Sequence, residues 1–310
     1  MNYVLVVGSI NMDQIFRLDH LPRPGETMLA GDVLTVPGGK GANQAVAAAR
    51  VGGCVQMVGR LGADPFGRSL RAALIADGVD VAGIREDADA TTGVALILLA
   101  EGRDNSIIVA SGTNMHVAPT DLDAVEWAAV GVLLVQLEIP FETVAEAMRR
   151  ARAAGVTVIL DPAPPRGCPP ELLALADILT PNETEASDLA GLPITDVPSA
   201  MAAARRLRSA ESQRVIVKLG GQGLVLCDAA GCRHLPAIPV PVVDTTAAGD
   251  AFCGALAARL AAGAAFDAAL RYAIAAGALA VTVLGAQPSL PTLAAVESLL
   301  QNNVRKTPDL

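Results

Sequence analysis

Aromatic side chains are scarce in this sequence. Phenylalanine, tryptophan and tyrosine together make up 3% of the 310 residues, whereas hydrophobic residues of all kinds make up 52%. The core must therefore be built from alanine, valine, leucine and isoleucine, a composition that suits helices packed on a buried parallel sheet. At about 100 to 200 residues per domain, the length allows two ordinary domains or one large α/β unit with a small appendage.

Basic residues are few and scattered. Lysine and arginine total 23 against 32 acidic residues, which gives a formal net charge of −9 and no basic stripe for nucleic acid. The N-terminal residues have neither the basic region nor the cleavage site of a signal peptide. The uncharged run 272–286 is shorter than the about 20 residues of a spanning helix, so we expect a buried helix there. These absences predict a cytoplasmic protein with no nucleic-acid or membrane partner.

Cysteines and histidines form no recognisable site. No cysteine pair has the C-x-x-C spacing, and one of the five is left over, so we expect buried free thiols. The three histidines lie outside every motif described below, which leaves a Ser-His-Asp or zinc-histidine mechanism with little support. The cysteines are Cys54, Cys168, Cys227, Cys232 and Cys253, and the histidines are His20, His116 and His234.

Short apolar runs alternate with helical patterns along most of the chain. The first run, residues 3–8, is typical of a central parallel strand. Alternation at this pace predicts a doubly wound, mainly parallel α/β sheet flanked by helices. Further strands are predicted at residues 55–59, 130–136, 156–160, 178–180, 215–219 and 224–227. Helices are predicted at residues 41–51, 65–77, 141–154, 183–189 and 199–209.

Two segments break this alternation. Residues 14–36 hold short extended pieces around a PRPGE turn, and residues 92–111 hold two strand-like runs joined by an EGRD turn. Four strands without intervening helices predict a small four-stranded β lid. The expected division is an α/β domain over residues 1–13, 37–91 and 112–300, a discontinuous lid over 14–36 and 92–111, and a flexible tail over 301–310.

Two polar motifs follow the first predicted strand. In GSINMD, residues 8–13, Asn11 and Asp13 are placed beyond the carboxyl end of a strand, where open α/β sheets bind ligands. Asn and Asp side chains also stabilise turns, so both interpretations stay open. In PGGKGANQAVAAA, residues 37–49, glycines and a lysine open a helix whose N–H groups can face a ligand. Asn43 could bind a hydroxylated substrate there, although the glycines could also serve close helix packing.

Two further motifs are weaker alone. In TPNETEASDLA, Asn182 and Glu185 have the spacing of a capping box, which would explain them without any ligand. In KLGGQG, residues 218–223, a glycine turn between two strands could let a ligand lie on bare backbone.

The segment DTTAAGDAF, residues 244–252, carries the strongest chemical signal. Ala247, Ala248 and Gly249 remove side chains from the start of a helix, where unpaired N–H groups and a partial positive charge of about +0.5 attract an anion. Asp250 follows directly and could accept a proton from an attacking hydroxyl. An anion hole beside a general base is the layout that phosphoryl transfer to an alcohol requires. Asp250 could instead be only a favourable helix-cap residue, but that leaves the small residues unexplained.

Taken together, these motifs resemble the ribokinase/phosphofructokinase-B family of carbohydrate kinases over about residues 3 to 300. The matching segments are, in order, GSINMD, PRPGE, GGKGANQAVAAAR, TGVALI, QLEIP, DPAP, TPNETEA, DTTAAGDAF and GAQPS. DTTAAGD with GGKGAN is specific to the family. Within the family, GSINMD, GGKGANQA, TGVALI and QLE favour D-ribose as the substrate.

The resemblance implies roles for individual residues. It makes Ala247, Ala248 and Gly249 the anion hole and Asp250 the general base. The implied sugar-binding residues are Asn11, Asp13, Gly39, Lys40, Gly41, Asn43, Glu138 and Asp250. The implied ATP-binding residues are Asn182, Lys218, Gly220, Gly221, Gly223, Gly249 and Ile274. The implied potassium ligands are the side chains of Asp244 and Ser289 and the backbones of Thr246, Ala280, Val283 and Gly285, and Glu185 is associated with the magnesium-bound phosphates.

Two positions depart from the family pattern. Ile274 stands near the expected adenine where relatives often have asparagine or histidine, which leaves that contact open. Thr113 precedes Asn114 where alanine is usual, with no expected consequence.

The resemblance implies ATP-dependent phosphorylation of D-ribose at its 5-hydroxyl, giving ribose 5-phosphate and ADP, with Mg²⁺ required and K⁺ activating. The lid would cover the sugar, and its exposed strand edges predict a homodimer through the lids. Alternatives within the family are kinases of deoxyribose, fructose or a nucleoside. A non-catalytic sugar-binding protein on the same fold is disfavoured by the intact Asp250. A dinucleotide-dependent oxidoreductase is set aside because the first strand leads into GSINMD rather than G-x-G-x-x-G.

Overall fold

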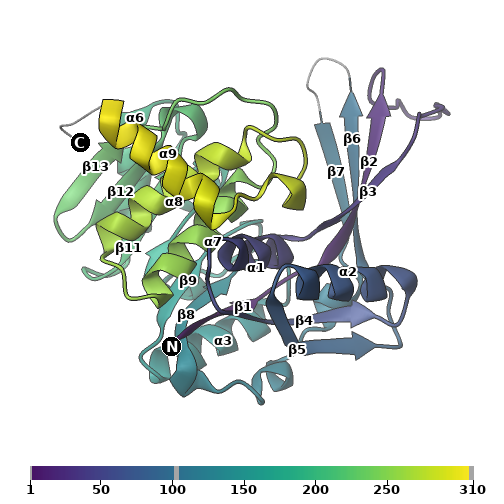
Figure 1. The fold of residues 1–310 in the computed structure, drawn as a ribbon, viewed down its shortest axis with the longest axis horizontal. Coiled ribbons are helices and arrows are strands. Elements are labelled where there is room, and N and C mark those ends of the chain that lie inside the picture. Colours follow the sequence, from purple (N-terminus) through teal and green to yellow (C-terminus); the bar gives the residue numbers. More distant parts are fainter. Residues whose placement is uncertain (1, 101–104, 307–310) are drawn as a thin grey trace.

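A nine-stranded sheet forms the centre of the computed structural model, which describes residues 2–100 and 105–306 (Figure 1). The strand order is β13-β12-β11-β10-β9-β8-β1-β4-β5. From β10 to β5 the pairings are parallel, as is that of β10 with β11. The strands are β1 Tyr3–Val7, β4 Val55–Gly62, β5 Val79–Asp87, β8 Val130–Val135, β9 Thr157–Leu160, β10 Ile178–Leu179, β11 Arg214–Lys218, β12 Leu224–Asp228 and β13 Gly231–Leu235.

Helices cover both faces of this sheet because its strands are apolar on both sides. In β1, Val4 and Val6 belong to one core cluster together with residues of α1, α7 and α8, whereas Leu5 and Val7 belong to a second cluster together with residues of α3, α5 and α6. Successive side chains of a strand point to opposite faces, so a continuous apolar run needs two helical layers. The helices are α1 Lys40–Arg50, α2 Pro65–Ala76, α3 Phe141–Ala153, α4 Pro170–Leu173, α5 Glu183–Ala190, α6 Val197–Leu207, α7 Ala248–Ala261, α8 Phe266–Ala280 and α9 Leu293–Lys306. The predicted doubly wound α/β class is confirmed.

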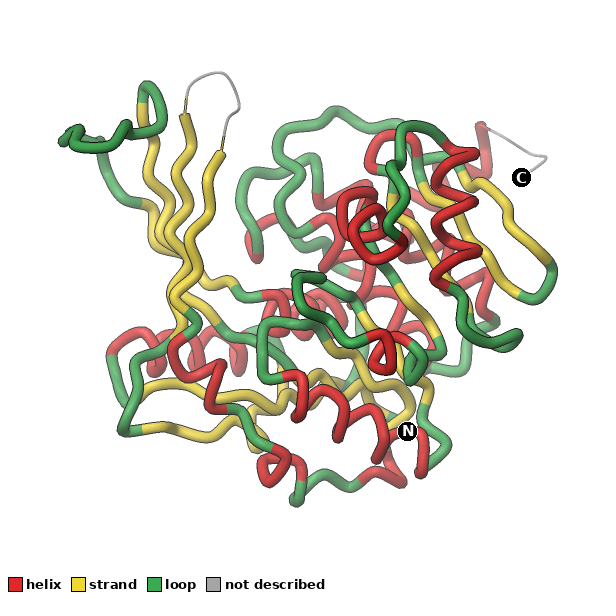
Figure 2. The backbone as a smooth tube through the Cα atoms, turned by 180° about the vertical axis from the view of Figure 1, so that it is seen from behind, coloured by secondary structure: helices red, strands yellow, loops and turns green. Residues whose placement is uncertain are grey.

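Four strands form a second sheet that stands away from the helical layers (Figures 1 and 2). Its order is β3-β2-β6-β7, with bounds β2 Asn11–Leu18, β3 Leu34–Gly38, β6 Gly93–Ala100 and β7 Asn105–Ala110. The predicted small four-stranded sheet is therefore present. It begins at Asn11 rather than after residue 13, so Asn11 and Asp13 lie on β2. The predicted EGRD turn lies outside the described residues.

The C-terminal part of the large sheet differs from the parallel pattern. β12 pairs antiparallel with β11 and with β13, and neither β13 nor β5 was among the predicted strands. Both are partly exposed edge strands, so they lack the continuous apolar run that reveals a central strand.

Two predicted boundaries near the C-terminus are also wrong. α8 ends at Ala280, so only the first part of the run 272–286 is helical, and Val283 and Leu284 beyond it are exposed. α9 continues to Lys306, across the residue 301 at which we expected a tail to begin. Among the described residues, none of the helices combines the length and the hydrophobicity needed to span a bilayer.

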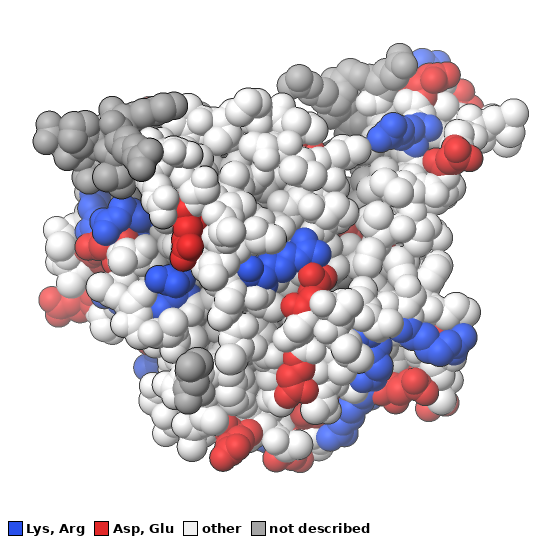
Figure 3. Space-filling view, in the orientation of Figure 1, with Lys and Arg blue, Asp and Glu red and all other residues white. Residues whose placement is uncertain are grey.

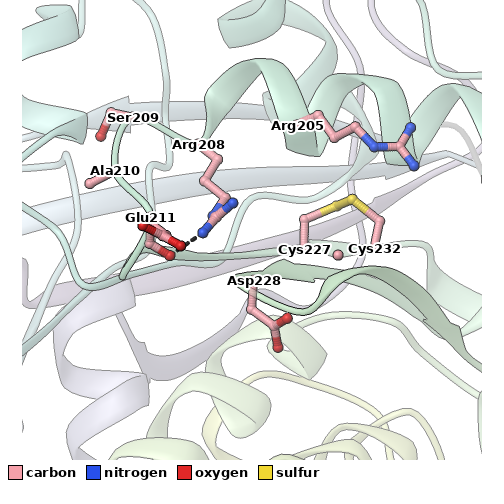
Figure 4. A pocket seen from close by; sticks show the side chains of 9 residues that line it. Arg205, Arg208, Ser209, Ala210, Glu211, Cys227, Asp228 and Cys232 are labelled. Carbon is pink, nitrogen blue, oxygen red and sulfur yellow. Dashed lines mark hydrogen bonds between the residues drawn. A yellow bond between two sulfur atoms is a disulfide. The ribbon is translucent and has the colours of Figure 1, made fainter.

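The prediction of five buried free thiols holds in full only for Cys253, because Cys168 is free but only partly buried and the other three differ more. Cys227 and Cys232 are directly opposite each other on β12 and β13 and form a disulfide, and Cys54 is exposed. The hairpin between β12 and β13, which the sequence pattern did not reveal, brings this pair together. A cavity of about 470 Å³ lies beside the disulfide, with Arg205 and Arg208 on its wall, and no predicted site residue lines it (Figure 4).

Candidate active site

The start of α7 presents open backbone N–H groups. Ala247, just before the helix, has a φ of 58°, the only positive φ of a non-glycine residue in the described part of the chain. The N–H groups of Gly249 and Asp250 find no acceptor among the described residues. A methyl group on Gly249 would lie 3.2 Å from Lys218 Nζ, so the glycine leaves room for this ammonium. Unpaired donors, the helix dipole and Lys218 together favour a phosphate here.

Asp250, in the first turn of α7, is a buried carboxylate held by two amides. Its Oδ1 accepts a hydrogen bond from Gln44 Nε2 at 3.0 Å, and its Oδ2 accepts one from Asn43 Nδ2 at 3.1 Å. Burial raises the pKa of Asp250, and the nearby Lys40 opposes the increase. A fixed carboxylate with a raised pKa beside an anion site is suited to take a proton from an alcohol.

Close packing of α1 and α7 creates this arrangement. A Cβ on Gly254 of α7 would lie 2.5 Å from the carbonyl oxygen of Gln44 on α1. A Cβ on Gly41 would lie 2.7 Å from Ser9 N at the end of β1. The two helices lie side by side in Figure 1. Glycines at these positions therefore bring the polar side chains of α1 against the first turn of α7, and close packing is part of their role.

The two residues on β2 that were predicted to bind sugar, Asn11 and Asp13, lie in spaces that glycines leave. A Cβ on Gly93 would lie 2.2 Å from Asn11 Oδ1, and a Cβ on Gly38 would lie 2.1 Å from an oxygen of Asp13. Asn114 Nδ2 donates to Asn11 Oδ1 at 2.7 Å and so sets the orientation of Asn11. Both predicted side chains are buried, at 3% and 7% exposure.

The acids on this side face one another. Burial, together with the charges of Glu138 and Asp250, raises the pKa of Asp13 to about 7. Glu138, after β8, accepts hydrogen bonds from Ser9 Oγ at 2.5 Å and from the backbone N–H of Lys40 at 3.4 Å. Burial opposes the charge of Lys40, but the surrounding carboxylates outweigh it and raise its pKa. The positive charge of Lys40 therefore reduces the repulsion among the carboxylates that surround it.

Three residues predicted to bind ATP or its magnesium lie at the ends of β10 and β11. Asn182 and Glu185 form the predicted capping box of α5, with bonds of 2.9 Å and 2.8 Å. Asn182 and Lys218 form a β-bridge, which places α5 beside Lys218. Burial raises the pKa of Glu185, and Asp161 adds to the increase.

The glycine turn and α8 form the remaining predicted nucleotide contacts. Cβ atoms on Gly220 or Gly221 would meet nothing within 4 Å, so this backbone is open to a ligand. Gly223 differs, because a Cβ there would lie 2.1 Å from the carbonyl oxygen of Leu235. Ile274 is partly buried against the core and offers an apolar surface.

Comparison with known proteins identifies the family. The description "pfkB family carbohydrate kinase" matches residues 1–293. The chain belongs to this family of kinases. A ribokinase from Bacillus subtilis is 41% identical over 97% of this chain and 100% of its own length. A bifunctional ribokinase/ribose-5-phosphate isomerase A from Fructilactobacillus sanfranciscensis is 38% identical over 99% of this chain, which spans 58% of that protein.

Solved structures agree with this assignment. The structure of Arabidopsis thaliana ribokinase complexed with ribose and ATP superposes with a TM-score of 0.87, at 36% identity over 97% of this chain and 99% of that one. The predicted resemblance to carbohydrate kinases is confirmed, and with it the expectation of a phosphotransferase.

In this pfkB kinase, the residues present could hold a magnesium ion only together with other ligands, such as substrate phosphates. No group of three or more histidine, cysteine or acidic residues in the described part of the chain could hold a metal ion by itself. Magnesium usually binds through one or two carboxylates and substrate phosphates, and Glu185 can supply one carboxylate.

A potassium ion fits four of the six residues predicted for it. Of the other two, the Ala280 carbonyl accepts a hydrogen bond from Val283 N at 3.4 Å, and Ser289 Oγ donates to the Ala286 carbonyl at 2.7 Å. Asp244 Oδ1 accepts from Thr246 N at 3.0 Å, and its Oδ2 accepts from Gly285 N at 2.8 Å, so the carboxylate joins the two loops. Burial opposes the charge of Asp244, but these N–H groups lower its pKa. The carbonyl oxygens of Thr246, Val283 and Gly285 receive no hydrogen bond from the described residues. Oxygens of this kind are ligands of hard cations.

Sequence reasoning missed four residues of the candidate site. Ser9 and Asn114 orient Glu138 and Asn11, and Gln44 and Asp161 connect Asp250 to Lys218. Three of them lie in or beside the recognised segments GSINMD, GGKGANQA and DPAP. Their side-chain partners are far away in the sequence, so the segments alone did not show the roles.

Proposed function

We propose that this protein transfers the γ-phosphoryl group of ATP to the 5-hydroxyl of D-ribose, giving ribose 5-phosphate and ADP. The observation that carries the proposal is the buried Asp250 carboxylate directly beside the open N-terminus of α7 and the ammonium of Lys218. Membership of the carbohydrate kinase family and the ribokinase relatives support the same reaction.

In the proposed reaction, Asp250 accepts the proton of the attacking hydroxyl. The N–H groups of Gly249 and Asp250 and the ammonium of Lys218 stabilise negative charge on the phosphoryl oxygens. Phosphoryl transfer depends mainly on positioning and on electrostatic stabilisation, and these fixed groups supply both. Magnesium, when bound, neutralises part of the phosphate charge, and Glu185 is the residue that would help to hold it.

Sugar recognition is assigned to Asn11, Asp13, Asn43 and Glu138, with the backbone of residues 39–41 beside them. Four polar side chains can pair several hydroxyl groups, which favours a small free sugar over a nucleoside. The lid sheet carries two of these residues, so it is suited to exclude water that would otherwise be phosphorylated in place of the sugar.

A homodimer through the lids is part of the proposal. Ile107, Ile108 and Val109 on the edge strand β7 are 57%, 59% and 45% exposed, as is Leu34 on the opposite edge at 47%. An unpaired apolar edge favours pairing with a second copy. We also assign the protein to the cytoplasm, where its two substrates are available.

A coupled assay of ADP release tests the function. Ribose, deoxyribose, fructose, adenosine and inosine are compared at matched concentrations of ATP and Mg²⁺. Ribose should give the highest kcat/KM. A higher kcat/KM with any other compound would make that compound the proposed substrate in place of ribose. If no compound stimulated ADP release, the proposed function would be overturned.

A further inference from the structure

Gln44 makes a set of buried hydrogen bonds that links the two ends of the site. Its side chain is fully buried on α1. Its Nε2 donates to Asp250 Oδ1 at 3.0 Å and to Asp161 Oδ2 at 2.9 Å. A side-chain amide has two N–H donors, so each of these carboxylates receives one.

Gln136 fixes the orientation of this amide. Gln136 Nε2 donates to Gln44 Oε1 at 2.6 Å, and its side chain is also fully buried. If the Gln44 amide rotated by 180°, its oxygen would face two carboxylates and its N–H groups would face a donor. A Cβ on Gly8 would lie 2.0 Å from Gln136 Oε1, so the glycine at this position leaves room for Gln136.

Asp161 extends the connection to the nucleotide side. Its Oδ1 accepts a hydrogen bond from Lys218 Nζ at 2.9 Å, and only 2% of the residue is exposed. Burial opposes ionisation, but Lys218 and Lys40 lower the pKa of Asp161, so the carboxylate stays charged. The same ammonium lies beside Gly249 at the start of α7.

We propose that Gln44 is a positioning residue for the base Asp250, and that Asp161 joins it to Lys218. One buried chain of hydrogen bonds then fixes the positions of both the proton acceptor, Asp250, and the ammonium of Lys218 beside the proposed phosphate site. This inference rests on the proposed function, because it assumes that Asp250 accepts the proton. Removing the chain should therefore lower kcat much more than it changes the KM for either substrate.

The effect on pH dependence has a defined direction. The charged or titratable groups that face Asp250 are Lys40 on α1, Asp161 after β9, Asp13 on β2 and Cys253 on α7. The hydrogen bonds from Gln44 and Asn43 lower the pKa of Asp250, against the effect of burial. In the pH profile of kcat, loss of the Gln44 bond should move the acidic limb, where activity falls as Asp250 is protonated, to higher pH. The profile is measured at saturating ribose, so that any effect of Asp13 protonation on sugar binding does not alter the measured kcat.

The main experiment compares Gln44→Leu with a matched control, Gln213→Leu. Gln213 is also buried and also donates two hydrogen bonds from Nε2, to the carbonyl oxygens of Leu173 and Ala176, but it lies outside the site. Both variants should lose thermal stability. Gln44→Leu should in addition lose about 10- to 100-fold in kcat, as expected for a lost bond to a charged group, and show the shifted acidic limb. Gln213→Leu should keep the kcat and the limb of the wild type.

Gln136→Leu keeps the proposal testable if Gln44→Leu does not fold, and a double variant extends the test if it does. Gln136→Leu leaves Gln44 in place but frees its amide to rotate. We therefore expect a smaller loss of kcat than in Gln44→Leu, with a shift of the acidic limb in the same direction. In the double variant Gln44→Leu with Asp161→Asn, the loss should be well below the product of the two single losses, because both act on one chain.

Some results would overturn the inference alone. With an active wild-type enzyme, a kcat for Gln44→Leu within twofold of wild type, or an unmoved limb in both Gln44→Leu and Gln136→Leu, would show that these residues only stabilise the fold. Absence of wild-type activity on every sugar would instead overturn the proposed function.

Discussion

Replacement of Asp250 by asparagine tests the proposed base with little change in shape. A positioned general base contributes about 10²- to 10⁴-fold in rate, which is about 3 to 5 kcal/mol at about 1.4 kcal/mol per factor of ten. Sugar and ATP should still bind, because their other contacts remain. We therefore expect kcat to fall by at least about 100-fold.

Stability should change much less than turnover. Each carboxylate oxygen of Asp250 accepts one N–H, so an amide at this position loses one of the two bonds and sets two N–H groups against each other. That change costs about 1 to 3 kcal/mol. Removal of a buried charge whose pKa is raised by burial acts in the opposite direction. The two effects offset each other, so Tm should shift by only a few degrees.

The assay is ADP release at saturating ribose and ATP, with binding of both substrates measured by calorimetry. Asp77→Asn is the control, because Asp77 is a carboxylate paired with Arg50 outside the site. Turnover of Asp250→Asn within threefold of wild type would refute the role of base. Loss of substrate binding would show that Asp250 acts mainly in recognition.

Three further predictions concern the anion site, the sugar side and the cation. Gly249→Ala should lower kcat at least about tenfold in the ADP-release assay, because its methyl group would crowd the Lys218 ammonium and cover the open N–H groups. Asp13→Asn should stabilise the protein at pH 8 but not at pH 4. The pKa of Asp13 is raised from 3.8 to about 7, so stability is lost as pH rises through this window, by at most about 4 kcal/mol. Restoring K⁺ to about 100 mM at constant ionic strength should raise the kcat of wild type but not that of Asp244→Asn.

Each of these predictions has a contradicting result. Unchanged kcat in Gly249→Ala would show that the anion does not approach this backbone. If Asp13→Asn changed Tm equally at pH 4 and pH 8, the buried charge of Asp13 would not be the cause of the change. If K⁺ did not change the kcat of the wild type, the proposed potassium site would be wrong. If K⁺ activated the wild type and Asp244→Asn equally, the potassium would bind without Asp244.

The charge distribution agrees with a small-molecule enzyme. On the face shown in Figure 3, basic and acidic residues alternate without an extended basic patch. The carboxylates of Asp13, Asp161 and Asp250 are buried instead.

The sequence by itself determined the fold class and the phosphotransferase class of the protein. Continuous apolar runs such as residues 3–8 predicted central strands, because a strand buried on both faces needs no polar alternation. Small residues before Asp250 predicted an anion site, because only a backbone without side chains exposes the N–H groups at a helix start. These signals are local, so they can be recognised without knowing what packs against them.

Only the tertiary structure decided which side chains meet. Gln44 reaches Asp250 across 206 residues of sequence, Asp161 across 117 and Gln136 across 92. The Cys227–Cys232 disulfide likewise depends on an antiparallel hairpin whose edge strand is partly exposed and carries no clear apolar run. Such contacts depend on how helices and strands pack, and no spacing within one segment encodes them. The same packing buries Asp13 and Asp250 together and so raises their pKa values, which no local pattern could predict.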